Sequence, residues 1–151
     1  MPAHYALASA TLIVAGLAAL SALTYAGIRP VRRVLRWPLL VTSSAACVLV
    51  FITADAGSTL LRTVEASASA AEVAAAQAHG HGSDSLTISI FFLFVTVLST
   101  VWGALRPNRE RWTVGMWTAA LILAITAVAT LVTSGVVVNA ALDAVRLGTA
   151  G

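Results

Sequence analysis

The chain has 151 residues, of which 59% are hydrophobic and only 10% are charged, and its mean hydropathy is +0.91. Soluble domains are about 45–50% apolar and about 25% charged, so the composition excludes an ordinary soluble domain and indicates an integral membrane protein. The formal net charge of +3 does not indicate nucleic-acid binding, because seven of the nine arginines lie in two short turns without a groove-binding element.

Four long apolar runs predict four transmembrane helices, since about 20 apolar residues are needed to cross a hydrocarbon core about 30 Å thick. In chain order the runs cover residues 6–28, 37–54, 86–105 and 112–142. They are continuous and do not alternate between polar and apolar residues, which favours helices over strands. We therefore expect an all-α, integral membrane four-helix bundle that forms a single transmembrane domain over residues 1–151, with both termini on the outer side.

Two arginine-rich turns orient this bundle. They begin at Arg29 and Arg106, each with Arg-Pro, and each is closely followed by Arg-Trp. Their face carries seven arginines and one glutamate, a net charge of +6, whereas the opposite face has a net charge of −3. Arginine in short loops marks the cytoplasmic side, so we predict a multi-pass protein of the bacterial plasma membrane with these turns in the cytoplasm. The aromatic residues expected to form a belt at this face are Tyr25, Trp37, Trp102 and Trp112.

The two turns are also similar to each other and lie 77 residues apart. This spacing suggests a parallel duplication of a helical hairpin, with two repeats related by an axis along the membrane normal. The preference for positive charge on the inner side would by itself make two inner turns alike. Both explanations therefore stay open.

The only sizeable polar stretch, residues 55–85, is predicted to be an outer loop. Its middle, residues 65–78, is rich in good helix formers but lacks an apolar period, which predicts a solvated or interfacial helix. We expect Gly80 and Gly82 to end this helix. The residues expected to cap the third span after that break are Ser83, Asp84 or Ser85.

Small and hydroxyl-bearing residues predict how the spans pack, because close approach of helices must replace the hydrophobic effect inside a bilayer. On the third span the predicted packing stripe is Ser89, Thr96 and Gly103. On the fourth it is Gly115 and Ala119, continued by Thr126, Thr130 and Thr133, and on the second it is Thr42, Ser43 and Ser44. No ionisable residue lies at the middle of a span, which argues against a proton pump or an ion-coupled carrier.

The candidate metal ligands gather at the outer face. His79 and His81 precede the third span, Asp84 follows them, Asp55 ends the second span, and His4 precedes the first. Imidazole and carboxylate groups can bind a divalent metal such as zinc, copper or nickel. The predicted metal site therefore consists of His79, His81, Asp84 and Asp55. The alternative for this Gly-rich segment is a solvated turn, and for Asp55 a carboxylate at the water interface.

A haem or quinone site is a second hypothesis for the outer half of the bundle. Here His4, His79 and His81 are the candidate cofactor ligands, since helical bundles hold haem iron between histidines. The rings that would flank such a cofactor are Phe51, Phe91, Phe92 and Phe94. The alternative is that these rings face lipid, and we expect no cofactor as the simpler case. No catalytic or nucleotide-binding motif is present in the sequence, so we do not expect an enzyme.

In its whole length the chain resembles the uncharacterised bacterial membrane family called domain of unknown function 2231. The features that carry the resemblance are a histidine opening the first span (His4), the end of the second span (Thr53–Gly57), and histidines before the third (His79 and His81). Some relatives in that family are joined to iron–sulfur redox domains. The resemblance therefore implies a respiratory setting without assigning an activity.

Two functions remain as predictions. The first is a small non-catalytic accessory or structural subunit of a larger membrane assembly, whose partners would be the lipid bilayer and other membrane subunits, with a homo-oligomer as a further alternative. The second is a haem- or metal-binding electron-transfer protein with its site at the outer face.

Overall fold

A computed structural model describes all residues except 1, 68–69, 106–112 and 149–151, and it describes side chains over residues 6–59, 82–105 and 113–142. Four long helices make up almost all of this part of the chain: α1 (Pro2–Gly27), α2 (Arg32–Ser67), α3 (Ala70–Ser99) and α4 (Val114–Gly148). The short 3-10 turn Arg29–Val31 joins α1 to α2, and the π-helical turn Thr100–Ala104 follows α3.

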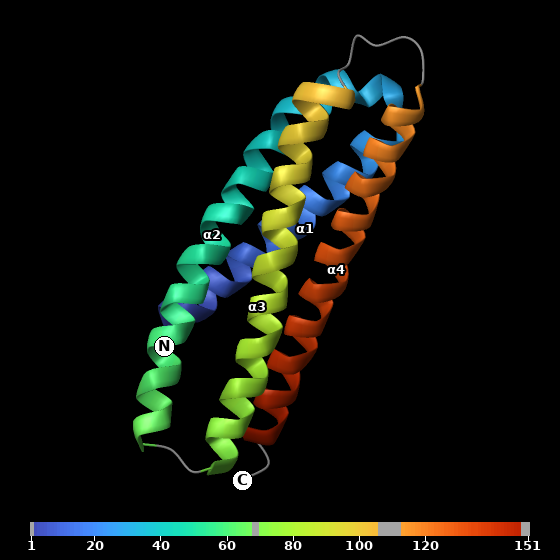
Figure 1. Cartoon of the computed structure of the whole chain (residues 1–151). Helices are drawn as coiled ribbons and strands as arrows, with labels where there is room; N and C mark the ends of the chain where they lie inside the picture. The colour runs from blue at the N-terminus through green and yellow to red at the C-terminus, as the bar shows by residue number, and fades with distance from the viewer. Residues whose placement is uncertain (1, 68–69, 106–112, 149–151) are drawn as a thin grey trace.

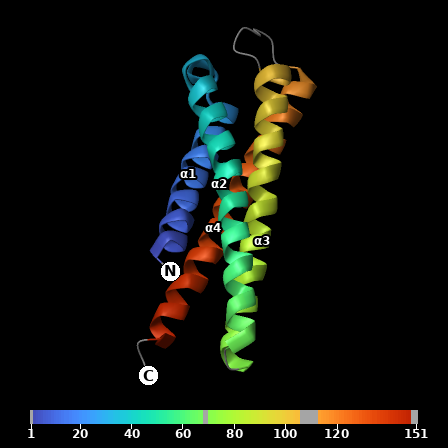
Figure 2. The ribbon, with the colours of Figure 1, turned by 90° about the vertical axis from the view of Figure 1, so that its left-hand side faces the viewer.

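The helices form a bundle in which each runs antiparallel to the next, and α4 closes the ring by packing against α1 (Figure 1). The end of the bundle that carries the turn from α1 to α2 is called the arginine end below. Figure 2 shows that the first residues of α1 and the last residues of α4 lie at the opposite end, where α2 also passes into α3. The start of α1 and the end of α4 thus lie toward the same end of the bundle, as predicted.

Each helix contains a segment long and apolar enough to cross a membrane. These segments are Ala6–Gly27, Arg29–Thr59, Gly82–Ala104 and Val114–Leu142. The all-α class and the four predicted spans are thereby confirmed. The second span starts earlier than predicted, because α2 already begins at Arg32 and continues through Pro38. Pro38 is the seventh residue of α2, past the first turn, so its missing N–H removes the backbone hydrogen bond that this position would donate to Val34 O.

Residues 65–67 and 70–78 are helical, as predicted, but the loop predicted around them over residues 55–85 is wrong. Helix α2 continues to Ser67, α3 begins at Ala70, and Gly80 and Gly82 lie inside α3 without breaking it. Ser83, Asp84 and Ser85 therefore do not cap a helix. The physical reason is that each glycine costs only about 1 kcal/mol inside a helix, while the apolar span has already nucleated the helix that the alanine-rich stretch extends. A methyl group at Gly82 would lie 3.7 Å from the Val137 side chain, so Gly82 also packs against α4.

The interior face of α1 is made of alanine. Ala15, Ala18, Ala19 and Ala22 are completely buried, and Ala26 is nearly so. Their spacing of three and four residues places them on one side of the helix. Alanine lets helix backbones approach closely, which is how helices gain packing energy when lipid already surrounds their apolar groups. We infer that α1 is held in the bundle mainly through this alanine face.

The predicted small-residue stripe on α3 is wrong, because Gly103 is exposed and a methyl group placed on it would meet no atom within 4 Å. Ser89 and Thr96 are only half-buried. The side of α3 that faces the interior instead carries branched residues, which are Leu86, Ile90, Leu93 and Val97, and Val101 of the π-helical turn continues this row. Large residues on α3 thus fill the space beside the small residues of α1, as close packing requires.

Predicted packing residues on α4 and α2 are confirmed in part. Thr130 is completely buried and Ser43 is 1% exposed, whereas Gly115 is exposed. The remaining predicted positions are half-buried, namely Ala119, Thr126, Thr133, Thr42 and Ser44. Interior hydroxyls satisfy their hydrogen bonds within the bundle. Thr130 Oγ1 donates to Thr126 O at 2.9 Å and lies 3.3 Å from Ser89 O of α3.

One hydrogen bond joins α1 to α2 through two side chains. The hydroxyls of Thr11 and Thr53 are 2.9 Å apart, and each is also 2.8 Å from the backbone carbonyl four residues before it. One hydroxyl therefore donates to the other, which donates to the carbonyl of its own helix. Such bonds between membrane helices contribute about 0.6 kcal/mol on average. They fix the register of two helices more than they stabilise the bundle.

Candidate functional site

The three histidines of the predicted sites belong to helices. His4 lies in the first turns of α1, and His79 and His81 lie in α3, not in a loop. All three lie toward the end of the bundle opposite the arginine end, as predicted. Their side chains lie outside the described residues, as does that of Trp112. The histidine sites therefore stay predictions.

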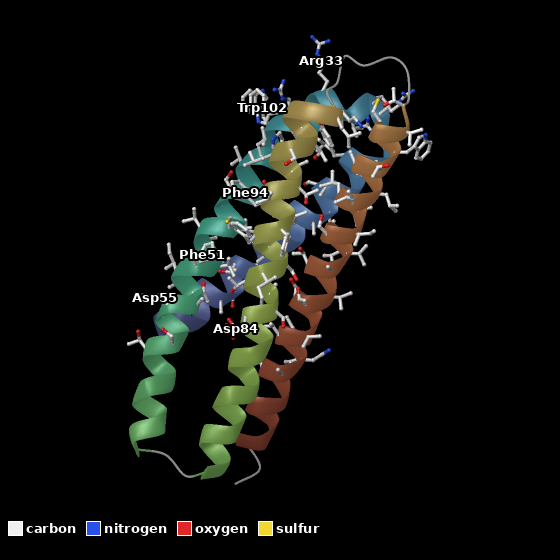
Figure 3. All side chains as sticks on the ribbon, viewed as in Figure 1. Arg33, Phe51, Asp55, Asp84, Phe94 and Trp102 are labelled. Carbon is white, nitrogen blue, oxygen red and sulfur yellow. The ribbon has the colours of Figure 1, made fainter. Side chains whose placement is uncertain are left out.

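The two carboxylates of the predicted metal site lie on neighbouring helices. Asp55 is inside α2 and Asp84 is inside α3, at similar heights in the bundle, and both are exposed (Figure 3). Asp55 does not end its helix. Its backbone carbonyl accepts hydrogen bonds from the hydroxyls of Ser58 at 2.9 Å and Thr59 at 3.1 Å. Over the side chains that the structure describes, no group of three metal-ligating residues comes together.

The phenylalanines proposed to flank a haem or quinone ring mostly point away from the interior. Phe91 and Phe92 are 45% and 57% exposed, and Phe51 is 51% exposed on α2. Phe94 is half-buried. In a membrane, exposed rings at this depth contact lipid chains. The described residues thus favour the alternative interpretation, in which these rings face lipid.

The arginine end contains a cluster of polar contacts that sequence reasoning did not anticipate. Its centre is Arg32, which is only 2% exposed. Arg32 Nε donates to Tyr25 O at 2.9 Å, and its Nη2 donates to Ala26 O at 2.8 Å. These carbonyls belong to the last turn of α1, where backbone acceptors have no intrahelical partner. One guanidinium therefore caps the end of α1 while belonging to the start of α2.

Tyr25 connects the same cluster to Leu105, the residue that follows the π-helical turn. Its ring lies 5.8 Å from the guanidinium carbon of Arg32, and its hydroxyl donates to Leu105 O at 2.9 Å. Leu105 in turn donates from its backbone N–H to Thr100 O at 2.9 Å, closing the π-helical turn. Tyr25 is completely buried. Its predicted place in an aromatic belt is therefore wrong, because a phenol that is paired to a buried carbonyl belongs to the core.

Arg36 and two tryptophans form the outer part of the cluster. The guanidinium carbon of Arg36 lies 4.4 Å from the ring centroid of Trp102 and 5.5 Å from that of Trp37. The two rings meet edge to face, with centroids 6.4 Å apart and an interplanar angle of 84°. Both tryptophans are exposed (Figure 3 labels Trp102), as a belt at the membrane surface requires. The π-helical turn carries Trp102 and so positions its ring next to Arg36.

The sequence contains four arginines between positions 29 and 36, and nothing in their spacing identifies which one is buried. The geometry of the turn determines which arginine is buried. The 3-10 turn Arg29–Val31 reverses the chain within a few residues and brings Arg32 beneath the end of α1. Tyr25 is the residue that could have indicated the burial of Arg32, since a tyrosine seven residues earlier is close enough to contact it across a tight turn.

The fold and its polar cluster define a helical, four-span membrane protein whose two ends differ in chemistry. One end contains a built arginine and aromatic cluster, and the other contains exposed carboxylates. Comparisons of the chain with protein-family models, with characterised proteins and with solved structures find no match.

Proposed function

We propose that this chain is a non-catalytic subunit of a larger membrane assembly. The observation that carries the proposal is the composition of the bundle interior. Among the described residues, the buried side chains are apolar or carry a hydroxyl, except for Arg32 at the arginine end. Proton relays and many ion-coupled carriers use ionisable groups in the membrane interior. A packed apolar bundle with a capped hairpin is suited to structural support.

The outer surface of the bundle is consistent with this role. Large aliphatic side chains are exposed on all four helices. Only 17% of the α4 span is buried inside the bundle, compared with 33% of the span in α3. Apolar helix faces of this kind contact lipid or the helices of other subunits.

Purification at two detergent strengths tests the proposal. The chain is tagged at its chromosomal locus and isolated in a mild and in a harsher detergent. We expect the same large membrane subunits at a fixed stoichiometry in the mild detergent, and loss of that assembly when the gene is deleted. A single monodisperse species in both detergents, with every membrane complex intact in the deletion strain, would contradict the proposal.

The electron-transfer alternative is tested on the same sample. A haem-binding protein shows a Soret absorption band, and a metal site retains near-stoichiometric metal after purification. Either result would support the electron-transfer alternative, with His4, His79 and His81 as the candidate ligands. The outward direction of the rings at positions 51, 91 and 92 is the observation that makes us place this alternative second. The respiratory setting of the assembly rests on the family resemblance alone.

We also propose that the arginine end faces the cytoplasm of a bacterial cell. The Cys47→Ala variant has no cysteine. In this background, the labelling of a single cysteine introduced at an exposed position shows on which side of the membrane that position lies. We expect Ser58→Cys to react with a membrane-impermeant maleimide in intact cells and Arg33→Cys to react only in opened membranes. The reverse labelling pattern would invert the orientation.

A further inference from the structure

We propose that Arg36, held against Trp37 and Trp102, binds the phosphate of an anionic phospholipid at the arginine end of the bundle. This inference does not depend on the proposed function. It concerns a surface site between α2 and the π-helical turn after α3, at the level where phospholipid headgroups lie if the four segments cross a membrane.

The geometry of Arg36 leaves its hydrogen-bonding capacity unused. Its guanidinium is 4.4 Å from the Trp102 ring centroid, which fixes the group through a cation–π contact. The Nε atom is covered by protein and has no hydrogen-bond partner. The side chain as a whole is half-buried, and Nε is the guanidinium atom that is fully covered. A phosphate oxygen is the acceptor that best matches a planar guanidinium fork.

The net positive charge at the arginine end also favours the binding of an anion. The segment from Arg29 to Trp37 contains four arginines and no carboxylate. Asp55 is the first acidic residue further along α2, and nineteen residues of helix place it about 28 Å away. The two arginine-rich turns together contain a single glutamate, Glu110, whose position lies outside the described residues. Their excess positive charge attracts the anionic lipids of a membrane surface.

The surface next to Arg36 is suited to a lipid rather than to free phosphate. Arg33 is exposed and extends from the arginine end (Figure 3), where it adds a second positive charge. Exposed apolar residues adjoin Arg36, namely Trp37 of α2, Trp102 of the π-helical turn, and Leu98, one turn before Trp102 in α3. Acyl chains below a bound headgroup would cover these side chains. A site for inorganic phosphate needs no such apolar surface.

Native mass spectrometry of the detergent-purified protein tests the proposal. The protein is titrated with phosphatidylglycerol, with phosphatidylcholine of the same chains, and with inorganic phosphate. We expect saturable binding of phosphatidylglycerol, and about tenfold weaker binding in Arg36→Gln, the loss that removal of a charged hydrogen bond produces. Arg62→Gln, which makes the same change near the opposite end of α2, serves as the matched control and should bind like the unchanged protein.

Three outcomes would overturn the proposal. They are equal affinity for phosphatidylglycerol and phosphatidylcholine, unchanged affinity in Arg36→Gln, and full competition by inorganic phosphate at the concentration of the lipid. If Arg36→Gln fails to fold, Arg36→Lys carries the test, because it keeps the charge but loses the planar fork. We expect Arg36→Lys to bind phosphatidylglycerol a few-fold more weakly than the unchanged protein, and equal binding would contradict a site built on the guanidinium.

Discussion

Replacement of Arg32 by alanine is expected to lower the free energy of unfolding of the bundle by about 2–4 kcal/mol, because two hydrogen bonds from a charged donor are lost in a buried site. The acceptors are Tyr25 O and Ala26 O at the end of α1, which would remain buried without partners. The loss of the side chain also removes its packing against the Tyr25 ring. Unfolding in mixed micelles of mild detergent and dodecyl sulfate measures the change.

Arg33→Ala provides the control for this prediction. It removes the same charge one residue later, but Arg33 is exposed. Exposed substitutions usually change stability by no more than about 0.5 kcal/mol. Equal losses for the two variants would show that net charge, and not the cap on α1, determines stability at this end. Arg32→Lys should fall between them, because a point-like ammonium cannot reproduce the two directed bonds of the guanidinium.

Replacement of Ala22 by leucine is expected to destabilise the bundle by about 1–3 kcal/mol, since added side-chain volume in a filled interior forces helices apart. Ala22 is completely buried on the alanine face of α1. Its cluster includes Tyr25, Leu39 and Val97 from three helices, so the extra volume has no open direction. Thermal unfolding in detergent, followed by circular dichroism, measures the loss as a lower midpoint.

Ala129→Leu is the matched control for Ala22→Leu. It introduces the same side chain at an exposed position in the middle of α4, where lipid or detergent accommodates it. We expect its midpoint to stay close to that of the unchanged protein. If Ala22→Leu also left the midpoint unchanged, the close packing of α1 would be contradicted.

The existence and order of the four spans could be predicted from the sequence because crossing a bilayer imposes a length of about 20 apolar residues, whatever the helices pack against. The ends of the helices could not be predicted in the same way. The stretch from Asp55 to Ser85 is polar, and its glycines and lack of an apolar period predict a separate solvated helix within a loop. Alanine-rich polar sequence can equally extend a helix that has already formed, and α2 and α3 do so.

The interior face of each helix was also difficult to predict. In a soluble bundle the buried side is recognised by its apolar period, but in a membrane the lipid-facing side is equally apolar. Residue size is then the remaining signal. The spacing of Ala15, Ala18, Ala22 and Ala26 contained it, whereas the prediction relied on hydroxyls and glycines of α3 and α4, which are partly exposed.

The candidate site could likewise be predicted only in part from the sequence. The accumulation of arginine and tryptophan at one end follows from membrane electrostatics and was predicted from residue type. The selection of Arg32 as a buried cap, and of Arg36 as the residue stacked on Trp102, depends on the exact path of the turn. Residue type alone carries no such information. The carboxylates Asp55 and Asp84 were placed on the correct side but remain exposed.

The continuity of α2 has a mechanical consequence. This helix has 36 residues, which corresponds to a length of about 54 Å, well beyond the thickness of a hydrocarbon core. A stiff rod of that length acts as a lever between the two membrane surfaces. If α2 tilts by about 10° around its arginine end, its far end moves by about 9 Å. Because α2 packs against both α1 and α3, such a tilt would have to carry these neighbours with it.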